Sequence, residues 1–234
     1  LRYVFNPKCG SWLRNTWEER YDAKLGGGGL YGEPMNRAEA LKRLPPDFVT
    51  DAPAWTNVDG KAALRFEKGS FLQFPHETML RGAPYTIAFE IRPDDASDQV
   101  LIRTRGAGDK EAQMAVFIKD GTLHLTPYGI LYYRYPDFDT GVRVQPGAWN
   151  RIAISRDYTR FRVMVNGETR DFPYSRRAQL YQGFVFGSNV QPGHNIPAGI
   201  RPFALRESLK DVPWIDRDLV HWELYAKKNG NFRR

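Results

Sequence analysis

The sequence contains a single cysteine, Cys9, among 234 residues. An internal disulfide needs two cysteines and a thiolate metal cluster needs several, so both are excluded. The lack of a disulfide does not decide the compartment, because many secreted bacterial proteins and cytosolic proteins have none.

Long hydrophobic runs are absent as well. No stretch approaches the roughly 18 apolar residues that a membrane-spanning helix requires, so we expect no membrane span. The chain also does not open with the basic, apolar and small-residue pattern of a signal peptide. Because it starts at Leu1 instead of Met, we expect a processed or excised product.

The composition is that of a folded, basic protein. Hydrophobic residues make up 41% and aromatic residues 14%, which excludes global disorder. The net charge of +7 favours polyanionic partners, although solubility alone also accounts for a modest excess of this size. The signatures of nucleic-acid recognition are missing, namely a recognition helix, a long basic tail and aromatic RNA-binding strands, so we expect no nucleic-acid partner.

From Ala54 onward the sequence is a succession of short strands. Turn signals recur about every 8 to 12 residues, the spacing of a sandwich or barrel, and no long amphipathic helix interrupts them. We therefore predict an all-β, two-sheet antiparallel β-sandwich over residues 54–206. Residues 1–53 are predicted to be an irregular segment with a first strand and a short helix at 36–44. Residues 207–234 are predicted to be a tail that packs on the sandwich.

Residues 147–168 show the alternation most clearly. In the first run Asn150, Ile152 and Ile154 share one face, and after a turn at Asp157-Tyr158 a second run alternates in the same way. Asn166-Gly167 is a strong signal for a tight hairpin turn. The stretch is thus predicted to be a three-stranded meander. The alternation predicts the following residues for the interface between the sheets: Tyr85, Ile87, Phe89, Ile91, Ile152, Ile154, Phe161, Val163 and Val165.

The same meander predicts a basic face. If Ser155 opposes Arg160 across the turn, then Arg151, Arg160 and Arg162 share one outward face of the sheet. Guanidinium groups placed in this way bind carboxylates or sulfates. The alternative is an ordinary solvated face.

Five cues along the chain occur in an order that is more specific than any one of them. They are APAWTNVDGKAALRFEKGSFLQFP, GAPYTIAFEIRPDD, AVFIKDGTLHL, QPGAWNRIAISRD and FRVMVNGE. In this order, over about residues 54–203, the chain resembles the concanavalin A-like jelly roll of laminin-G-like domains. It departs from the family at Asn150-Arg151, where two histidines are frequent, and in its first 50 residues.

The resemblance implies a fold and leaves the function open. Carbohydrate-binding modules, adhesion modules, glycoside hydrolases and polysaccharide lyases all occur on it. It also allows a structural Ca²⁺ as cofactor, held by loop aspartates. The candidates are Asp94, Asp95, Asp98, Asp137 and Asp139, although their spacing is not that of an EF-hand.

The most unusual stretch is TPYGILYYRYPDFD, residues 126–139. Aromatic rings offer flat faces to sugars, and hydroxyl and guanidinium groups donate hydrogen bonds to them. The alternative is that half of the rings pack inward as strand residues. The candidate substrate-binding residues here are Tyr128, Tyr132, Tyr133, Arg134 and Tyr135. His194, in a Gly/Pro-rich loop, is a further candidate.

Catalytic signals are weak. A retaining glycosidase needs two carboxylates about 5 Å apart, but Pro93 separates Glu90 from Asp94, and Glu90 is predicted to be a solvated charge. The lyase motifs R-[ST]-E-L-R, Q-[IV]-H and Y-F-K-A-G-x-Y are absent. His124 alternates with Leu123 and Leu125 and is predicted to be an exposed residue on the polar face of its strand.

These observations favour a carbohydrate-binding, lectin-like module that recognises a polysaccharide, including an acidic one. We expect it to belong to a larger secreted or periplasmic polysaccharide-processing protein, with a covalently linked catalytic domain outside this chain. Two alternatives stay open. One is a polysaccharide lyase or glycoside hydrolase on the same fold, and the other is a protein–protein adhesion module.

Overall fold

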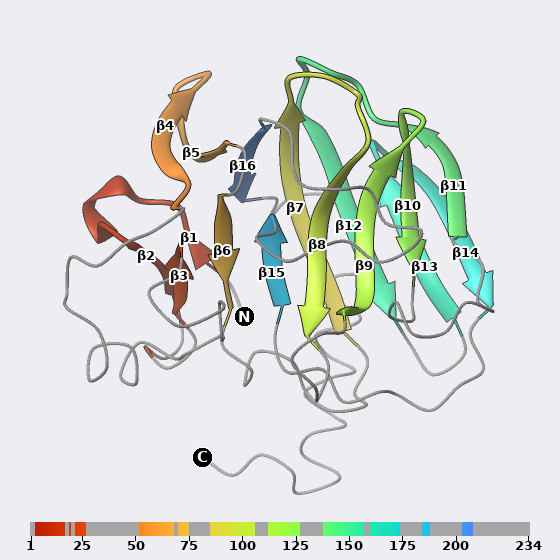
Figure 1. Cartoon of the computed structure of the whole chain (residues 1–234), viewed down its shortest axis with the longest axis horizontal. Helices are drawn as coiled ribbons and strands as arrows, with labels where there is room; N and C mark the ends of the chain where they lie inside the picture. The colour runs from red at the N-terminus through yellow and green to blue at the C-terminus, as the bar shows by residue number, and fades with distance from the viewer. Residues whose placement is uncertain are drawn as a thin grey trace, which may run out of the picture.

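The structure, a computed structural model, describes residues 3–16, 19, 22–26, 52–67, 70–74, 85–105, 112–126, 138–156, 160–173, 184–187 and 203–207. Within these ranges the chain forms two antiparallel sheets, of nine and seven strands, packed face to face (Figure 1). The predicted two-sheet antiparallel β-sandwich is therefore confirmed.

The nine-stranded sheet has the order β1-β2-β3-β6-β15-β8-β9-β10-β11. In chain order its strands are β1 (Tyr3–Val4), β2 (Trp12–Asn15), β3 (Ala23–Leu25), β6 (Phe71–Gln73), β8 (Gln99–Arg105), β9 (Ala112–Lys119), β10 (Thr122–Thr126), β11 (Phe138–Arg143) and β15 (Phe184–Gly187). A 3₁₀ helix, η1 (Pro7–Cys9), joins β1 to β2 and is capped by the side chain of Asn6.

The seven-stranded sheet has the order β14-β13-β12-β7-β16-β5-β4. Its strands are β4 (Ala54–Val58), β5 (Lys61–Phe66), β7 (Tyr85–Pro93), β12 (Asn150–Arg156), β13 (Arg160–Val165), β14 (Glu168–Pro173) and β16 (Phe203–Glu207). The last strand of the chain, β16, lies between β7 and β5, so residues distant in sequence become neighbours on this sheet.

The predicted meander is strands β12, β13 and β14, and its antiparallel pairing is confirmed. Asn166 and Gly167 have φ values of 52° and 94°, the left-handed conformation that this tight turn requires. The predicted register was wrong by one two-residue step. Ser155 lies opposite Arg162, not Arg160, because the pairing of Arg156 with Phe161 centres the connection between β12 and β13 one residue further along the chain than the predicted turn. A two-residue shift preserves the faces.

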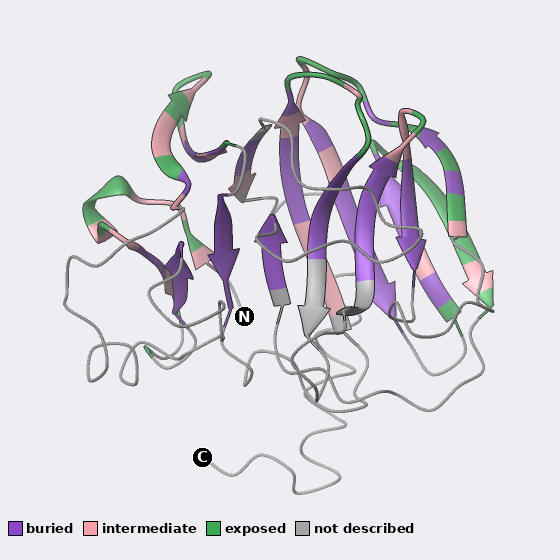
Figure 2. Ribbon diagram, viewed as in Figure 1, coloured by how far each residue is buried: buried purple, intermediate pink, exposed green. Residues whose placement is uncertain are grey.

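The core lies between the sheets. Seven of the predicted interface residues are buried in one cluster, and Ile87 packs against that cluster while partly exposed. The side chain of Tyr85 lies outside the described residues. Figure 2 shows buried residues running through both sheets, with exposed residues gathered in the turns and on the edge strands β4 and β14. A fully buried ring such as that of Phe161 contributes about 2–3 kcal/mol by removal from water.

The N-terminal segment takes more part in the sandwich than its sequence indicated. Strand β1 was expected, but β2 and β3 were not, and β3 pairs with β6 to extend the nine-stranded sheet. The indole Nε1 of Trp55 donates to the carbonyl of Gly10 at 2.6 Å and ties this segment to β4. The predicted helix at 36–44 lies outside the described residues, and the division of the chain into three parts stays a prediction. No helix in the part of the chain that the structure describes is long and apolar enough to cross a membrane.

Candidate binding site on the seven-stranded sheet

The site lies on the face of the seven-stranded sheet that points away from the core. On β7, Phe89 and Ile91 belong to the core cluster, so the alternation of the strand sends Glu90 and Arg92 to the outer face. Strands β12 and β16 flank β7 and add their own outward residues. The outer face thus carries a row of charged side chains that crosses three strands.

Glu90 is the centre of this row. Its carboxylate accepts from Nε of Arg151 at 3.3 Å and from Nε of Arg206 at 2.5 Å, and its side chain is only 11% exposed. The prediction that Glu90 is a solvated charge was therefore wrong. A carboxylate removed from water needs cationic partners, and here it has two. The carboxylate of Glu90 thus has a guanidinium partner from each of the two neighbouring strands.

Trp149 forms one wall of the site. The guanidinium of Arg206 lies over its ring, 3.8 Å from the centroid, and Nε1 of the indole donates to Asp59 at 2.9 Å. Asp59 starts the tight turn between β4 and β5, where it has a φ of 53°. The ring is therefore fixed on one face by a cation and at its edge by a carboxylate.

Asn166 holds the other wall. Its Oδ1 accepts from the backbone N–H of Arg151 at 2.9 Å, and its Nδ2 donates to Oδ1 of Asn150 at 3.0 Å. Asn150 is fully buried and donates in turn to the carbonyls of Gln145 and Ala148. The turn that begins at Asn166 is thus locked to the start of β12, which positions Arg151.

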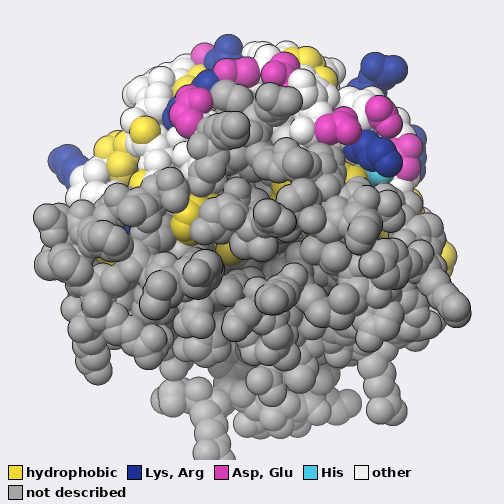
Figure 3. All heavy atoms as spheres, in the orientation of Figure 1, with side chains coloured by type: hydrophobic (Ala, Val, Ile, Leu, Met, Phe, Trp, Pro, Cys, Tyr) yellow, Lys and Arg dark blue, Asp and Glu magenta, His cyan; other side chains and the backbone are white. Residues whose placement is uncertain are grey.

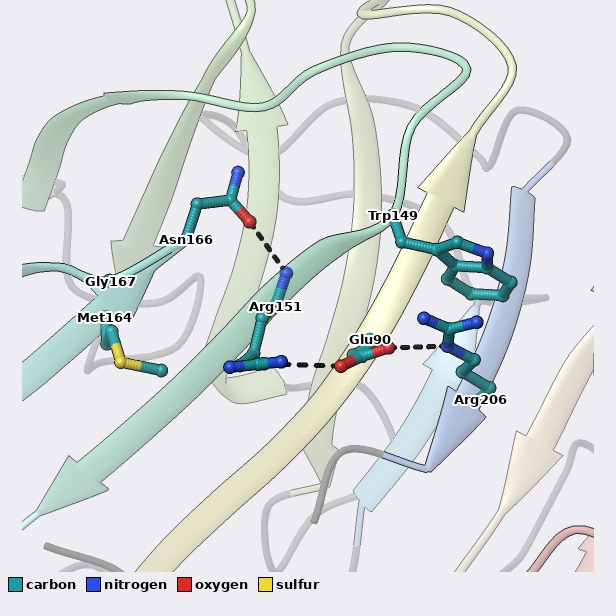
Figure 4. Close-up of a pocket in the computed structure, with 7 residues that line it drawn as sticks. All are labelled: Glu90, Trp149, Arg151, Met164, Asn166, Gly167 and Arg206. Carbon is teal, nitrogen blue, oxygen red and sulfur yellow. Dashed lines mark hydrogen bonds and ion pairs between the residues drawn. The ribbon is translucent and has the colours of Figure 1, made fainter. Parts of the chain in front are cut away.

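Together these side chains enclose a depression of about 320 Å³. Figure 4 shows Arg151, Glu90 and Arg206 in a row across β12, β7 and β16, with the indole of Trp149 beside the guanidinium of Arg206. The lining residues are Glu90, Trp149, Arg151, Met164, Asn166, Gly167 and Arg206. The depression is therefore polar and rich in hydrogen-bond donors, with one aromatic wall.

The arginines predicted as one face fall into two groups. Arg151 belongs to the Glu90 site, whereas Arg162 lies opposite Ser155, about 13 Å further along β12. Arg160 and Arg162 share Asp171 on β14, with N–O distances of 3.0 Å and 2.8 Å. The hydrogen bond from Arg162 is the main cause that lowers the pKa of Asp171. This second group repeats the arrangement of two arginines around one carboxylate.

Charges of both signs also mix elsewhere on the surface. Figure 3 shows described acidic and basic side chains intermingled along the upper rim of the viewed face. The net positive charge of the chain is thus not gathered into a single basic patch on the described part of that face.

The predicted tyrosine stretch cannot be placed, since Tyr128, Tyr132, Tyr133, Arg134 and Tyr135 lie outside the described residues. His194 lies outside them too. Their role in binding stays a prediction.

His124 departs from its prediction. It is on the outer face of β10, as its alternation with two core leucines indicated, but it is buried instead of exposed. Its ring stacks on Phe117 with 5.3 Å between centroids, and its Nε2 is 2.9 Å from Oγ1 of Thr122. Apolar residues on this face of the sheet, among them Val100 and Ala115, are themselves fully buried, which explains why His124 is covered as well.

The aspartates proposed for calcium have protein partners. Asp94 binds the guanidinium of Arg65, Asp98 accepts from the backbone N–H of Asp120, and Asp139 accepts from that of Gly141. The last of these bonds is the main cause that lowers the pKa of Asp139. Over the described ranges no three histidine, cysteine or acidic residues are grouped to hold a metal ion. Asp137 lies outside these ranges, and a structural calcium ion stays a prediction.

Sequence reasoning missed Arg206, Asn166 and the role of Glu90 in the site. For Arg206 the sequence carried no signal, because its place depends on β16 inserting beside β7. For Asn150 the sequence did carry a signal, since a polar residue on the core-facing side of a strand needs a hydrogen-bonding partner.

The family follows from a direct comparison. A laminin G family model, described as the concanavalin A-like lectin/glucanases superfamily, matches residues 66–196, more than half of the chain. The chain belongs to this superfamily. No curated protein sequence matches it significantly.

Solved structures of this superfamily fold are similar to the chain at low sequence identity. A sialidase from Trypanosoma rangeli, in complex with sialic acid, has a TM-score of 0.52 and 13% identity over 88% of this chain and 29% of its own. Domains LG4-5 of the mouse laminin alpha1 chain have a TM-score of 0.51 and 14% identity, over 70% of this chain and 46% of the laminin chain. Domain 4 of an extracellular arabinanase from Geobacillus stearothermophilus, in complex with arabinotriose, has a TM-score of 0.48 and 15% identity. The match covers 73% of this chain and 82% of the arabinanase domain. The chain thus spans less than half of the sialidase and laminin chains, and its similarity to these two concerns the fold.

Proposed function

We propose that this chain is a carbohydrate-binding module that recognises an acidic polysaccharide through the Glu90 site. The observation that carries the proposal is the row Arg151–Glu90–Arg206 beside the ring of Trp149. The superfamily description, which names lectins and glucanases, agrees with a carbohydrate ligand.

The chemistry of the site suits an anionic sugar. A guanidinium carries five N–H donors in a planar fork that matches carboxylates and sulfates. Two of the seven lining residues are arginines and one is a glutamate, so guanidinium groups outnumber carboxylates in the lining. The depression is polar, and sugars present hydroxyl groups that can accept from the arginines and from Asn166.

Binding is favoured over hydrolysis by the arrangement of carboxylates. Glycoside hydrolysis needs two of them, about 5 to 9.5 Å apart. Glu90 is the one carboxylate among the seven lining residues, and Asp59 at the edge of the site accepts from the indole of Trp149. Asp94 is four residues further along the chain than Glu90, which in extended backbone is about 13 Å. Those seven residues also include no tyrosine or histidine that could serve as the base of a lyase.

We further propose that the module is secreted or periplasmic and acts beside a catalytic domain on a longer chain. Two of the structures it resembles are much longer than this chain, which covers 29% of one and 46% of the other. A domain that binds polysaccharide without transforming it increases the effective concentration of a linked enzyme at its substrate.

The test is a binding panel by isothermal titration calorimetry with alginate, glucuronan, ulvan, chondroitin sulfate and a neutral glucan. We expect binding to at least one acidic polymer and none to the glucan. Arg206→Ala should weaken it at least 10-fold. Arg170→Ala removes the same charge from the edge strand β14, where Arg170 is half exposed, and should change it less than 2-fold.

Two results would overturn the proposal. Equal losses in the two variants would mean that binding reports only net charge. A growing ultraviolet absorbance of unsaturated uronates, with any of these polymers, would make the chain a lyase.

A further inference from the structure

A second depression adjoins the Glu90 site on the same outer face. It has a volume of about 560 Å³ and is lined by Thr56, Val58, Arg65, Arg92, Asp94, Gly147 and Ala204. Its residues come from β4, β5, β7 and β16 and from the loop before β12. None of these seven residues lines the Glu90 site.

The two depressions meet on β7 and β16. Arg92 follows Glu90 by two residues on β7, and Ala204 precedes Arg206 by two on β16, so each pair lies about 7 Å apart on one face. Asp59 contacts one lining residue of each depression, since it accepts from the indole of Trp149 and lies 3.8 Å from Nη1 of Arg92. The depressions are therefore neighbouring parts of one surface that crosses the sheet from β13 to β4.

Charged side chains of both signs line the second depression as well. Arg65 donates two hydrogen bonds to Asp94, at 2.6 and 2.5 Å, and Nε of Arg92 donates to the carbonyl of Gly147 at 2.8 Å. At its edge Glu67 also accepts from Nε of Arg65 at 2.9 Å, and Asp59 lies 3.8 Å from Arg92, so three carboxylates meet the two arginines of this depression. The small side chain of Ala204, which is 3% exposed, forms the floor between them and leaves the space above it open.

We infer that the two depressions are consecutive subsites of one groove that binds a linear oligosaccharide, with an acidic sugar in the Glu90 site and further sugar hydroxyl groups in the second depression. Arg151 on β12 and Arg65 on β5 are separated by three strand spacings, about 14 Å, which is longer than one sugar ring. A monosaccharide can therefore fill one subsite only, whereas a longer oligomer reaches both. This inference rests on the proposed function and adds the length and linear shape of its ligand.

The experiment measures affinity against length, with size-fractionated oligomers of each polysaccharide that binds in the panel. Affinity should grow at least 10-fold from the shortest oligomer that binds to those that fill both subsites. Thr56→Trp fills the second depression without changing a charge. It should abolish the gain with length and leave the affinity of the shortest oligomer unchanged.

Asn57→Trp is the matched control, because it places the same ring one residue along β4, on the opposite face of the strand. It should preserve the gain with length. The inference is overturned if all lengths bind equally, or if Thr56→Trp and Asn57→Trp behave alike. In either case the Arg206→Ala result decides the proposed function independently, and a failure of every polymer to bind overturns both.

Discussion

The guanidinium of Arg206 lies over the indole ring of Trp149, 3.8 Å from its centroid. Trp149 immediately precedes β12, and Arg206 lies on β16. These two strands are the neighbours of β7 in the sheet, one on each side. Arg206 also donates to Glu90, 116 residues away in the sequence. The last described strand thus completes a site that the middle of the chain begins.

Glu90 should contribute to stability as well as to the site. Glu90→Gln removes the negative charge that two arginines share, and we expect the free energy of unfolding to fall by about 2 kcal/mol or more, since the pair is largely buried. Urea denaturation measures it. Glu67→Gln breaks an ion pair in which the glutamate is 61% exposed and should cost less than about 1 kcal/mol. Equal costs would mean that burial of Glu90 has no energetic consequence.

We predict that Arg160 and Arg162 also contact a bound acidic polymer, so that Asp171 competes with it for these arginines. Asp171→Asn should therefore raise the affinity for an acidic polymer several-fold, whereas Arg162→Ala should lower it. Added salt should lower the affinity of both variants, because it screens exposed charges. Glu168→Gln is the control, because Glu168 pairs with Arg170 on the edge strand. Titration calorimetry at two salt concentrations gives the comparison. A similar gain from both acidic substitutions would point to net charge alone.

Acid should destabilise the fold through Asp94 and Asp171. Hydrogen bonds from Arg65 and Arg162 hold the pKa of these carboxyls below the ordinary value. A depressed pKa contributes stability above the unfolded pKa, near 3.9, and that contribution is lost as the pH falls through the lower folded value. Thermal unfolding between pH 2 and 6 should show a flatter decline below about pH 4 in Asp171→Asn than in the wild type. Parallel curves would contradict this assignment.

Two substitutions in the Asn166-Gly167 turn distinguish backbone strain from the positioning role of the Asn166 side chain. Gly167 has a φ of 94° and nothing within 4 Å of an added Cβ, so Gly167→Ala should cost about 1–2 kcal/mol through the backbone alone. Asn166→Ala also removes the bonds to Arg151 and Asn150 and should cost a similar amount. Asn166→Ala should weaken polysaccharide binding clearly more than Gly167→Ala, which only adds a methyl group to the lining. Urea denaturation and calorimetry on the same samples test this, and equal effects on binding would contradict the positioning role of Asn166.

Local patterns predicted the sandwich well. Alternation identified the core side chains of β7, β12 and β13, and the Asn-Gly pair identified the hairpin, because both depend on neighbouring residues only. The predicted register of β12 against β13 was wrong because the position of the turn centre could not be read from Asp157-Tyr158.

The site depended on longer-range pairing. The predicted outward direction of Arg151 was correct, but its partner Glu90 became visible only when β12 was placed beside β7. Burial of Glu90 and His124 was missed for a related reason. Alternation assigns a residue to a face of a sheet, and it does not say whether other parts of the chain cover that face.

The most direct test of the central claim is the indole Nε1–H resonance of Trp149 in a nitrogen-15 correlation spectrum, assigned with Trp149→Phe. That proton donates to Asp59, and the ring lies against Arg206, so it reports on both sides of the site. We predict that an acidic oligosaccharide from the binding panel shifts this resonance progressively to saturation, with the same affinity as calorimetry gives. Saturable binding that leaves the Trp149 resonance unmoved would contradict the assignment of this site.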